Sequence, residues 1–394
     1  MNKILILIAA VFTVFIMTAC NGEDFSKLER ELNTGISSDI STPTVEVITT
    51  TPQEFPVKLA WFYKPPADKN FASIANNYQF FILSKGNEKD RDYLLGLGAH
   101  RPILQYVRFD AIMDPGSCTR KPWQNNAAFM PGDFCMIDTQ HPDWFLMDSN
   151  GERYTEVNNG EIFVMMDPGS PGWRAFFLDR LKQTQQSDRN WDGVFLDNVE
   201  TTLVRYDQVD NLPQAYPDDL SYQKTIQSFV AYLHDNYFTP NRKLLFANII
   251  ARKDEDDWMN NIGHLDGVMH EGWSIDWPNR FRSAETWESQ MNLAEQTQAS
   301  GKTILLISQG TQPDLELQKF AYASYLLVNN GKAFFRYGNS QNYSESWLYD
   351  DYSIKLGMAL GPRFQDGDEW RRNFSNGYVI VNPAAHTAKI QLGN

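Results

Sequence analysis

Two short segments decide the fold of this chain: "WDGVFLDN" at residues 191–198 and "LDGVMHEG" at residues 265–272. Each carries Asp-Gly-Val, continues as an apolar run and ends on an acid, Asp197 in the first and Glu271 in the second. Apolar runs of strand length without polar alternation are typical of parallel strands that are covered on both faces. The repeat therefore predicts two equivalent parallel strands, each with a carboxylate at its carboxyl end.

Further runs of the same character lie on either side of this pair, and amphipathic stretches such as 285–300 and 313–330 separate them. These runs cover residues 58–63, 78–83, 102–107, 244–249, 303–308 and 332–337. Eight strands that alternate with helices predict an α/β fold, a (β/α)8 TIM barrel over residues 56–362. A doubly wound sheet is the alternative, but it would normally open with a Gly-rich turn that residues 61–70 do not offer.

Two segments lie outside this alternation. A long insertion at 108–170, between the third and fourth strands, contains Cys118 and Cys135. In an exported protein these two cysteines are expected to form a disulfide, and two free buried thiols are the alternative. Residues 363–394 contain strand-like runs around an "SNG" turn and predict a small C-terminal β appendage.

The N-terminus has the plan of a signal peptide at residues 1–20. Lys3 precedes an apolar run, and the run ends in "MTAC", which resembles a bacterial lipobox with Cys20 as the lipidated residue. Ordinary cleavage nearby is the alternative. Residues 21–55 are polar and rich in Ser, Thr and Pro, which predicts a disordered tether.

Composition and motifs exclude several function classes. The chain has 35 Lys+Arg against 49 Asp+Glu, and a formal net charge of −14 argues against nucleic acid or an anionic membrane surface as a partner. His264 and His270 lie six residues apart across a turn and a strand, which is poor metal geometry, and no His-Glu-x-x-His motif occurs. Nucleophile-elbow, phosphate-loop and dinucleotide motifs are also missing from the sequence. We therefore expect neither a metal nor a cofactor.

The two acids predict glycosidic chemistry. Catalytic groups of a (β/α)8 barrel lie at the carboxyl ends of its strands, and Asp197 and Glu271 end strands four and six. Cleavage of a glycosidic bond uses such a pair, because one carboxyl group protonates the leaving oxygen while the other attacks or activates water. As an alternative, an acid at a strand end only caps a helix or binds a loop.

Several segments resemble the TIM-barrel glycoside hydrolases, in particular the hypothetical glycoside-hydrolase-like families related to the endo-polygalactosaminidases and, more remotely, to the α-galactosidase clan. The segments are "DGVFLDN", "GVMHEGW", "HPDWFLMDSNG", "DPGSPGWR" and "FSNGYVIVNP". The resemblance covers the chain from about residue 56 onward. It implies that Asp197 is the nucleophile and that Glu271 is the general acid/base.

Other strand ends supply candidate substrate-binding residues, since Trp and Tyr offer flat faces to sugars while Asn, Gln and Arg offer hydrogen bonds to hydroxyl groups. The candidates are Trp61, Tyr63, Gln105, Tyr106, Asn198, Asn248, Trp273, Gln309, Arg336 and Tyr337.

The sequence thus predicts an exported glycoside hydrolase of a poly- or oligosaccharide, a monomer that contacts the membrane only through its lipid anchor. A retaining mechanism would place the two carboxyl groups about 5–5.5 Å apart, and an inverting one would place them about 6.5–9.5 Å apart. A non-catalytic carbohydrate-binding lipoprotein on the same barrel is the main alternative. A purely structural lipoprotein is the third, and it predicts no accessible cleft beside the two acids.

Overall fold

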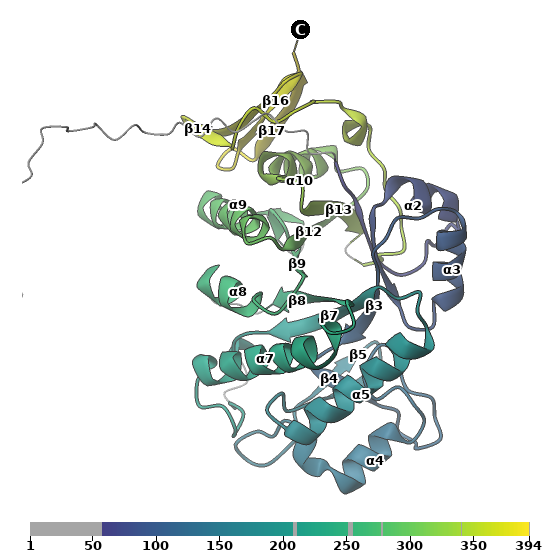
Figure 1. Cartoon of the computed structure of the whole chain (residues 1–394). Coiled ribbons are helices and arrows are strands. Elements are labelled where there is room, and N and C mark those ends of the chain that lie inside the picture. Colours follow the sequence, from purple (N-terminus) through teal and green to yellow (C-terminus); the bar gives the residue numbers. More distant parts are fainter. Residues whose placement is uncertain (1–56, 208–210, 251–254, 277–278, 340, 394) are drawn as a thin grey trace, which may run out of the picture. The chain divides into compact units, whose positions relative to one another are not determined.

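The computed structural model describes residues 57–207, 211–250, 255–276, 279–339 and 341–393 (Figure 1). The signal peptide, Cys20 and the tether at 21–55 lie outside these residues. No helix within the described ranges has both the length and the apolar character needed to cross a membrane.

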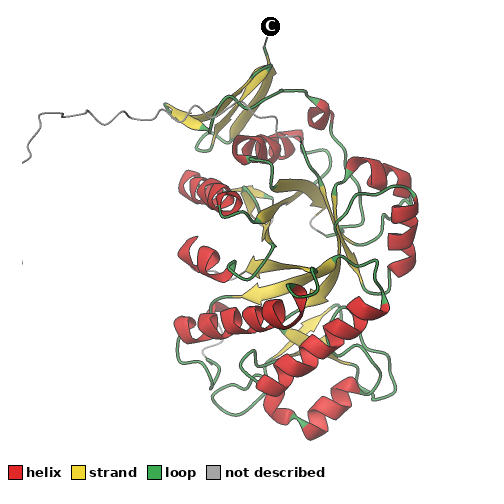
Figure 2. Cartoon of the chain, viewed as in Figure 1, coloured by secondary structure: helices red, strands yellow, loops and turns green. Residues whose placement is uncertain are grey.

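Eight parallel strands form the central sheet, as predicted, and their order along the sheet follows their order along the chain. A parallel bridge between Leu59 and Phe335 joins the first strand to the last and completes the ring. Figure 2 shows this barrel with helices around it. The strands are β1 (Ala60–Tyr63), β2 (Phe80–Ser84), β3 (Ile103–Arg108), β7 (Gly193–Glu200), β8 (Leu244–Ile250), β9 (Gly267–Glu271), β12 (Thr303–Gly310) and β13 (Ala333–Asn339).

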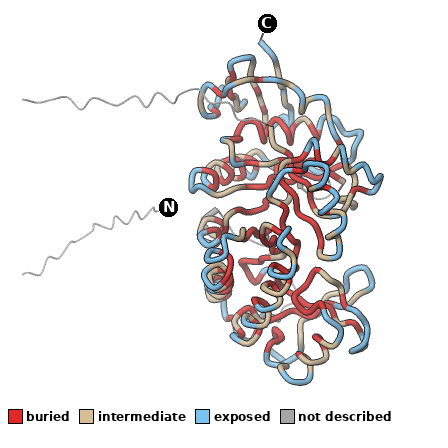
Figure 3. Tube along the Cα trace, turned by 45° about the vertical axis from the view of Figure 1, so that its right-hand side comes forward, coloured by how far each residue is buried: buried red, intermediate tan, exposed pale blue. Residues whose placement is uncertain are grey.

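Two apolar layers hold the barrel together, because successive side chains of a strand point to opposite faces. The inner layer fills the barrel and includes Phe62, Leu104, Phe195, Phe246 and Ile307. The outer layer is larger and packs the other face of the strands against the helices. Figure 3 shows the resulting buried stretches along the strands and the helices.

The helices between the strands begin at side-chain caps where the chain offers them. Ser170, Asp218, Ser283 and Asp314 each accept a hydrogen bond from a backbone N–H three residues later. The helices are α2 (Phe71–Asn77), α3 (Glu88–Gly96), α5 (Pro171–Ser187), α6 (Val204–Asp207), α7 (Asp219–Leu233), the π-helical turn η2 (His234–Phe238), α8 (Glu255–Asn261), α9 (Ala284–Ala299) and α10 (Leu315–Val328).

The insertion between β3 and β7 forms a small antiparallel sheet in the order β4-β6-β5, with a helix beside it. Cys118 and Cys135 are joined by a disulfide, with their Cα atoms 5.6 Å apart. Its elements are β4 (Ala111–Asp114), α4 (Asp133–Gln140), the 3-10 turn η1 (Pro142–Trp144), β5 (Thr155–Asn158) and β6 (Glu161–Met165).

The C-terminal segment forms a four-stranded antiparallel sheet that packs on α10. Arg372 links this sheet to α10, because its guanidinium donates to the backbone oxygens of Leu326, Leu327 and Asn329 at the end of the helix. The remaining elements are the hairpin of β10 (Ile275–Asp276) and β11 (Arg280–Phe281), the turn η3 (Asp350–Ser353), and strands β14 (Phe364–Asp366), β15 (Glu369–Phe374), β16 (Gly377–Asn382) and β17 (Thr387–Leu392).

Candidate active site

Asp197 lies in the carboxyl-terminal half of β7, three residues before the strand ends at Glu200, and Glu271 is the last residue of β9. The two strands lie on either side of β8. The pairing of β7 with β8 shifts register between Leu196 and Val199, so a bulge carries Asp197 and Asn198. Asn198 has a φ of 59°, a left-handed conformation that asparagine tolerates better than most residues. As whole residues, Asp197 and Glu271 are half-buried.

One amide joins the two acids. Nδ2 of Asn248, on the intervening strand β8, donates to Oδ1 of Asp197 at 3.0 Å and to Oε2 of Glu271 at 2.9 Å. These two oxygens therefore lie no more than about 6 Å apart, and about 5 Å apart if the two bonds follow the diverging N–H directions of the amide. The orientation of the amide is chemically determined, because a flip would place its oxygen against both carboxylates.

Asp197 has a second side-chain donor, since the hydroxyl group of Tyr106 on β3 donates to its other oxygen, Oδ2. The ring of Tyr63 stacks on the ring of Tyr106 at 4.8 Å with an interplanar angle of 21°. Trp123, from the insertion, meets Tyr106 edge-on at 6.0 Å. Aromatic rings therefore line the site on the side of Asp197.

Glu271 has donors of its own at Oε1. Tyr343 donates its hydroxyl hydrogen at 2.6 Å, and Nε2 of Gln309, in β12, donates at 2.9 Å. Tyr343 belongs to the loop after β13. Arg336 holds that loop, because its guanidinium donates to the backbone oxygens of Tyr343 at 2.6 Å and Glu345 at 3.0 Å.

Burial and the neighbouring charge raise the pKa values of the two acids. Burial raises the pKa of Glu271 and the neighbouring negative charge of Asp197 raises it further, while hydrogen bonds from Tyr343, Asn248 and Gln309 act in the opposite direction. Burial also raises the pKa of Asp197, but the hydrogen bonds from Tyr106 and Asn248 act in the opposite direction. The pair therefore keeps one proton to a higher pH than a free carboxylic acid, and Glu271 is the residue whose proton the other acid stabilises.

Four of the predicted substrate-binding residues lie around the acids: Tyr63, Tyr106, Asn248 and Gln309. Three of them, Tyr106, Asn248 and Gln309, contact the acids directly instead of only offering groups to a sugar. Asn198 lies beside Asp197 in sequence, but its amide donates to Asp110 at 3.4 Å and not to either acid.

The structure does not place four of the predicted substrate-binding residues at the site, because their side chains face outward toward the helices. These residues are Trp61, Gln105, Trp273 and Tyr337. Trp61 and Trp273 are fully buried in the outer apolar layer. Gln105 accepts a hydrogen bond from Gln185 of α5. The hydroxyl group of Tyr337 donates to the backbone oxygen of Thr311.

Arg336 was also predicted to bind substrate, but its side chain is buried. Its guanidinium is buried against the ring of Trp61, 4.3 Å from the ring centroid, and its hydrogen bonds go to backbone oxygens. It therefore positions the loop that carries Tyr343 and offers no free donor to a substrate.

Tyr343 and a charged cluster beside Asn198 were not predicted. The cluster consists of Arg108, Asp110, Glu156, Glu200 and Arg205, with Asp110 between the two arginines. Tyr343 lies in a loop without apolar periodicity, so the sequence offers no signal for it. The acids of the cluster come from three separate segments that meet only in the fold.

Within the described residues, one group of three His, Cys, Asp or Glu side chains has the spacing of a metal site. It consists of His234, Asp235 and His264, and it lies away from the two acids. At the acids themselves, each of the four carboxylate oxygens accepts a hydrogen bond from a neutral side chain.

Two carboxylates on strands four and six of an eight-stranded barrel are an arrangement that fits cleavage of a glycosidic bond. Residues 119–378 match the family described as hypothetical glycosyl hydrolase family 15, and the chain belongs to it. The protein is therefore a glycoside hydrolase. No curated protein matches the sequence.

Among solved structures, the chain is similar to the glycoside hydrolase domain of PelA from Pseudomonas aeruginosa, with 17% identity and a TM-score of 0.48 over 72% of this chain and 95% of that chain. It is also similar to the α-galactosidase TtGalA from Thermus thermophilus, with 12% identity and a TM-score of 0.47 over 85% of this chain and 68% of that chain. An α-amylase from Lactobacillus plantarum matches with 9% identity and a TM-score of 0.44 over 82% of this chain and 87% of that chain.

Proposed function

We propose that this protein is a retaining glycoside hydrolase that cleaves a poly- or oligosaccharide, with Asp197 as nucleophile and Glu271 as general acid/base. The observation that carries the proposal is the Asn248 amide that binds both carboxylates at 3.0 and 2.9 Å. Retaining enzymes hold the two carboxyl groups about 5–5.5 Å apart, whereas inverting enzymes leave about 6.5–9.5 Å for a water molecule. Two hydrogen bonds from one nitrogen span no more than about 6 Å, which favours the retaining geometry.

The different surroundings of the acids support these two roles. Asp197 accepts from Tyr106 and Asn248, and such donors stabilise the charged form that a nucleophile needs. The pKa of Glu271 is raised overall, because burial and the charge of Asp197 outweigh the hydrogen bonds from Tyr343, Asn248 and Gln309, and a raised pKa is what a general acid requires.

The reaction then runs in two balanced steps. In the first, an oxygen of Asp197 attacks the anomeric carbon, Glu271 gives its proton to the glycosidic oxygen, and the bond to the leaving sugar breaks. In the second, Glu271 takes a proton from water, the resulting hydroxide attacks the anomeric carbon, and the ester bond to Asp197 breaks. Two inversions give net retention, and both acids return to their starting state.

Aromatic rings around the acids support a sugar substrate. Tyr63 and Trp123 are partly exposed and lie beside Tyr106, so their faces are available to the C–H surfaces of a pyranose ring. We also propose that the enzyme acts outside the cytoplasm as a monomer held by lipid on Cys20, which the signal-peptide plan of residues 1–20 supports.

The test uses aryl glycosides with a good leaving group, screened over sugar type and anomer, and then bacterial exopolysaccharides. Proton NMR during the first minutes of hydrolysis reports the configuration of the first product. Asp197→Asn is expected to abolish turnover. Glu271→Gln is expected to slow hydrolysis of natural linkages by about 10³-fold but to spare the first step with dinitrophenyl leaving groups, because these need no protonation.

Rescue by azide then distinguishes the general acid/base from the nucleophile. With Glu271→Gln, azide should restore turnover and give a glycosyl azide of retained configuration, since it replaces water in the second step. A first product of inverted configuration would contradict the retaining mechanism. Light scattering of the mature chain tests the monomer, and palmitate labelling that is lost in Cys20→Ser tests the anchor.

A further inference from the structure

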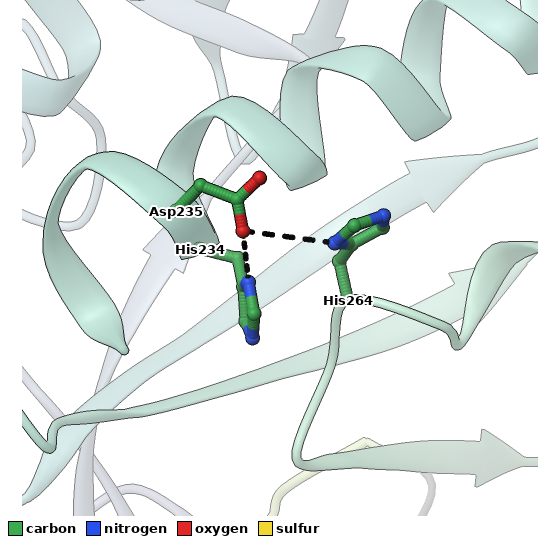
Figure 4. Close-up of side chains that lie close together, drawn as sticks. All are labelled: His234, Asp235 and His264. Atoms are coloured by element: carbon green, nitrogen blue, oxygen red, sulfur yellow. Dashed lines mark hydrogen bonds and ion pairs between the residues drawn. The ribbon is translucent and has the colours of Figure 1, made fainter. Parts of the chain in front are cut away.

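A cluster of two histidines and one aspartate lies apart from the active site. His234 and Asp235 occupy the π-helical turn η2 at the end of α7, and His264 lies in the turn between α8 and β9. Figure 4 shows both imidazole rings directed at the Asp235 carboxylate. Because His264 precedes β9 and Glu271 ends it, the cluster lies at the amino end of that strand, opposite the catalytic end.

The ligand atoms have the spacing of a divalent metal site. Nδ1 of His234 lies 2.6 Å from Oδ1 of Asp235, and Nδ1 of His264 lies 3.9 Å from the same oxygen. Each of the three side chains offers one ligand atom, and these atoms lie within 4.8 Å of one another. Ligands of a tetrahedral zinc ion with bonds of about 2.1 Å are separated by about 3.3 Å, so side-chain shifts of less than about 1 Å suffice.

The π-helical turn supplies the second partner that a metal-binding histidine usually has. A π-helix aligns residues five positions apart, and the hydroxyl group of Thr239 lies 2.7 Å from Nε2 of His234. With a metal on Nδ1, Nε2–H would donate to Thr239, which fixes the tautomer and the orientation of the ring.

Exposure gives the cluster an entry path and an open coordination position. The side chains of His264 and Asp235 are 48% and 62% exposed, so water can complete the coordination sphere. Two imidazoles and one carboxylate select a borderline ion such as Zn²⁺ over Ca²⁺ or Mg²⁺, which prefer oxygen ligands.

We propose that His234, Asp235 and His264 form a structural Zn²⁺ site that ties the end of α7 to the turn before β9. The ion would join two segments that are distant in sequence. It would stabilise the fold and take no part in glycoside hydrolysis.

The test uses the untagged, chelator-treated chain, because a histidine tag would itself bind zinc. Calorimetric titration with ZnCl2 should show one equivalent binding in the micromolar range, and saturating Zn²⁺ should raise the thermal midpoint by a few degrees. CaCl2 should do neither. Hydrolysis of an aryl glycoside should proceed at the same rate with and without Zn²⁺, so this test is independent of the proposed mechanism.

Two exposed substitutions and one matched control localise the ion. His264→Ala and Asp235→Asn should each weaken Zn²⁺ binding at least about tenfold and remove the thermal shift. His100→Ala changes another exposed histidine and should bind Zn²⁺ like the parent. Failure of the parent to saturate below about 1 mM Zn²⁺, or equal binding by the parent and His264→Ala, would overturn the proposal.

Discussion

Asn248 is the residue on which the geometry of the active site depends. Its single amide nitrogen holds both carboxylates, and its bonds lower the pKa of each acid by stabilising the charged form. Asn248→Ala removes both bonds, so the pKa of each acid should rise. The acid limb of the pH profile of kcat/KM should move to higher pH, and kcat should fall about 100-fold.

The control for this variant is Asn158→Ala, at an exposed position of β5. It should leave both the rate and the pH profile unchanged. An acid limb that moves to lower pH in Asn248→Ala, or an unchanged kcat, would show that the amide does not set the charge state of the pair.

Of the two acids, Tyr343 donates a hydrogen bond to Glu271. Its hydroxyl group donates to Oε1 at 2.6 Å and lowers the pKa of Glu271. Tyr343→Phe keeps the ring but removes this bond, which stabilises the carboxylate that Glu271 becomes when it gives up its proton. A hydrogen bond to a charged group contributes about 1.5–3 kcal/mol, so kcat should fall about 10–100-fold. The pKa of Glu271 should rise, and pH–rate profiles of kcat measure this shift.

Tyr349→Phe is the matched control, because its hydroxyl group donates to the backbone oxygen of Gln312 and not to a carboxylate. It should keep the parental profile. If the two variants behave alike, the Tyr343 hydroxyl group has no role in positioning or charging Glu271.

The sequence predicted the strands that carry the site. It did not predict which side chains of those strands point into the barrel and which point toward the helices. A continuous apolar run predicts a parallel strand covered on both faces, but for that reason it carries no alternation that tells inside from outside. Trp61 and Trp273 were therefore placed at the mouth, while in the structure they face the helices. Tyr343 comes from an irregular loop whose path depends on Arg336, a contact that only the fold creates.

At the scale of elements, the repeated Asp-Gly explains how two strands present their acids alike. Oδ2 of Asp192 accepts from the backbone N–H of Ile103 at 2.7 Å, and Oδ2 of Asp266 accepts from that of Leu245 at 2.8 Å. Each aspartate thus binds the amino end of the preceding strand in the barrel, far from the catalytic end. The same register is therefore imposed on β7 and β9.

The glycine of each pair allows the neighbouring strand to approach. A Cβ atom at Gly193 would lie 2.0 Å from the backbone oxygen of Leu244, which cannot move without breaking the pairing of β7 with β8. Gly193→Ala should therefore lower the free energy of unfolding by about 3 kcal/mol, measured by urea denaturation.

Gly263→Ala is the control, because a Cβ atom there meets nothing within 4 Å. It should change the free energy of unfolding by less than about 0.5 kcal/mol. Equal stability of the two variants would mean that β7 and β8 can separate without loss, against the packing described above.

At the scale of the whole molecule, the sequence predicted the barrel because each strand is a local pattern and the alternation with helices is regular. It could not predict the charged cluster beside the active site. Arg108 ends β3 and Asp110 follows it, Glu156 lies in the insertion, and Glu200 and Arg205 follow Asp197. Their ion pairs depend on how the insertion folds back onto the barrel, which no local pattern encodes.

This cluster should make stability depend on pH. It holds three acids and two arginines, and burial raises the pKa of Glu200 to about 7, despite an ion pair with Arg205 at 2.6 Å. In the unfolded chain a glutamate has a pKa of about 4.3, so between that pH and about 7 the unfolded chain loses this proton while the folded protein keeps it. Glu200 therefore favours the folded state at low pH, and this contribution is lost as the pH rises through about 7.

Glu200→Gln removes the titration but keeps the shape of the side chain. Between pH 5 and pH 8, the parent should lose about 3 kcal/mol of unfolding free energy relative to this variant, because a shift of one pKa unit corresponds to about 1.4 kcal/mol. Urea denaturation of both proteins at several pH values measures the difference. Glu152→Gln, at an exposed position, should follow the parent at every pH. A constant difference between parent and Glu200→Gln would show instead that Arg205 keeps Glu200 charged in the folded protein, and that the cluster is a fixed ion-pair network throughout this range.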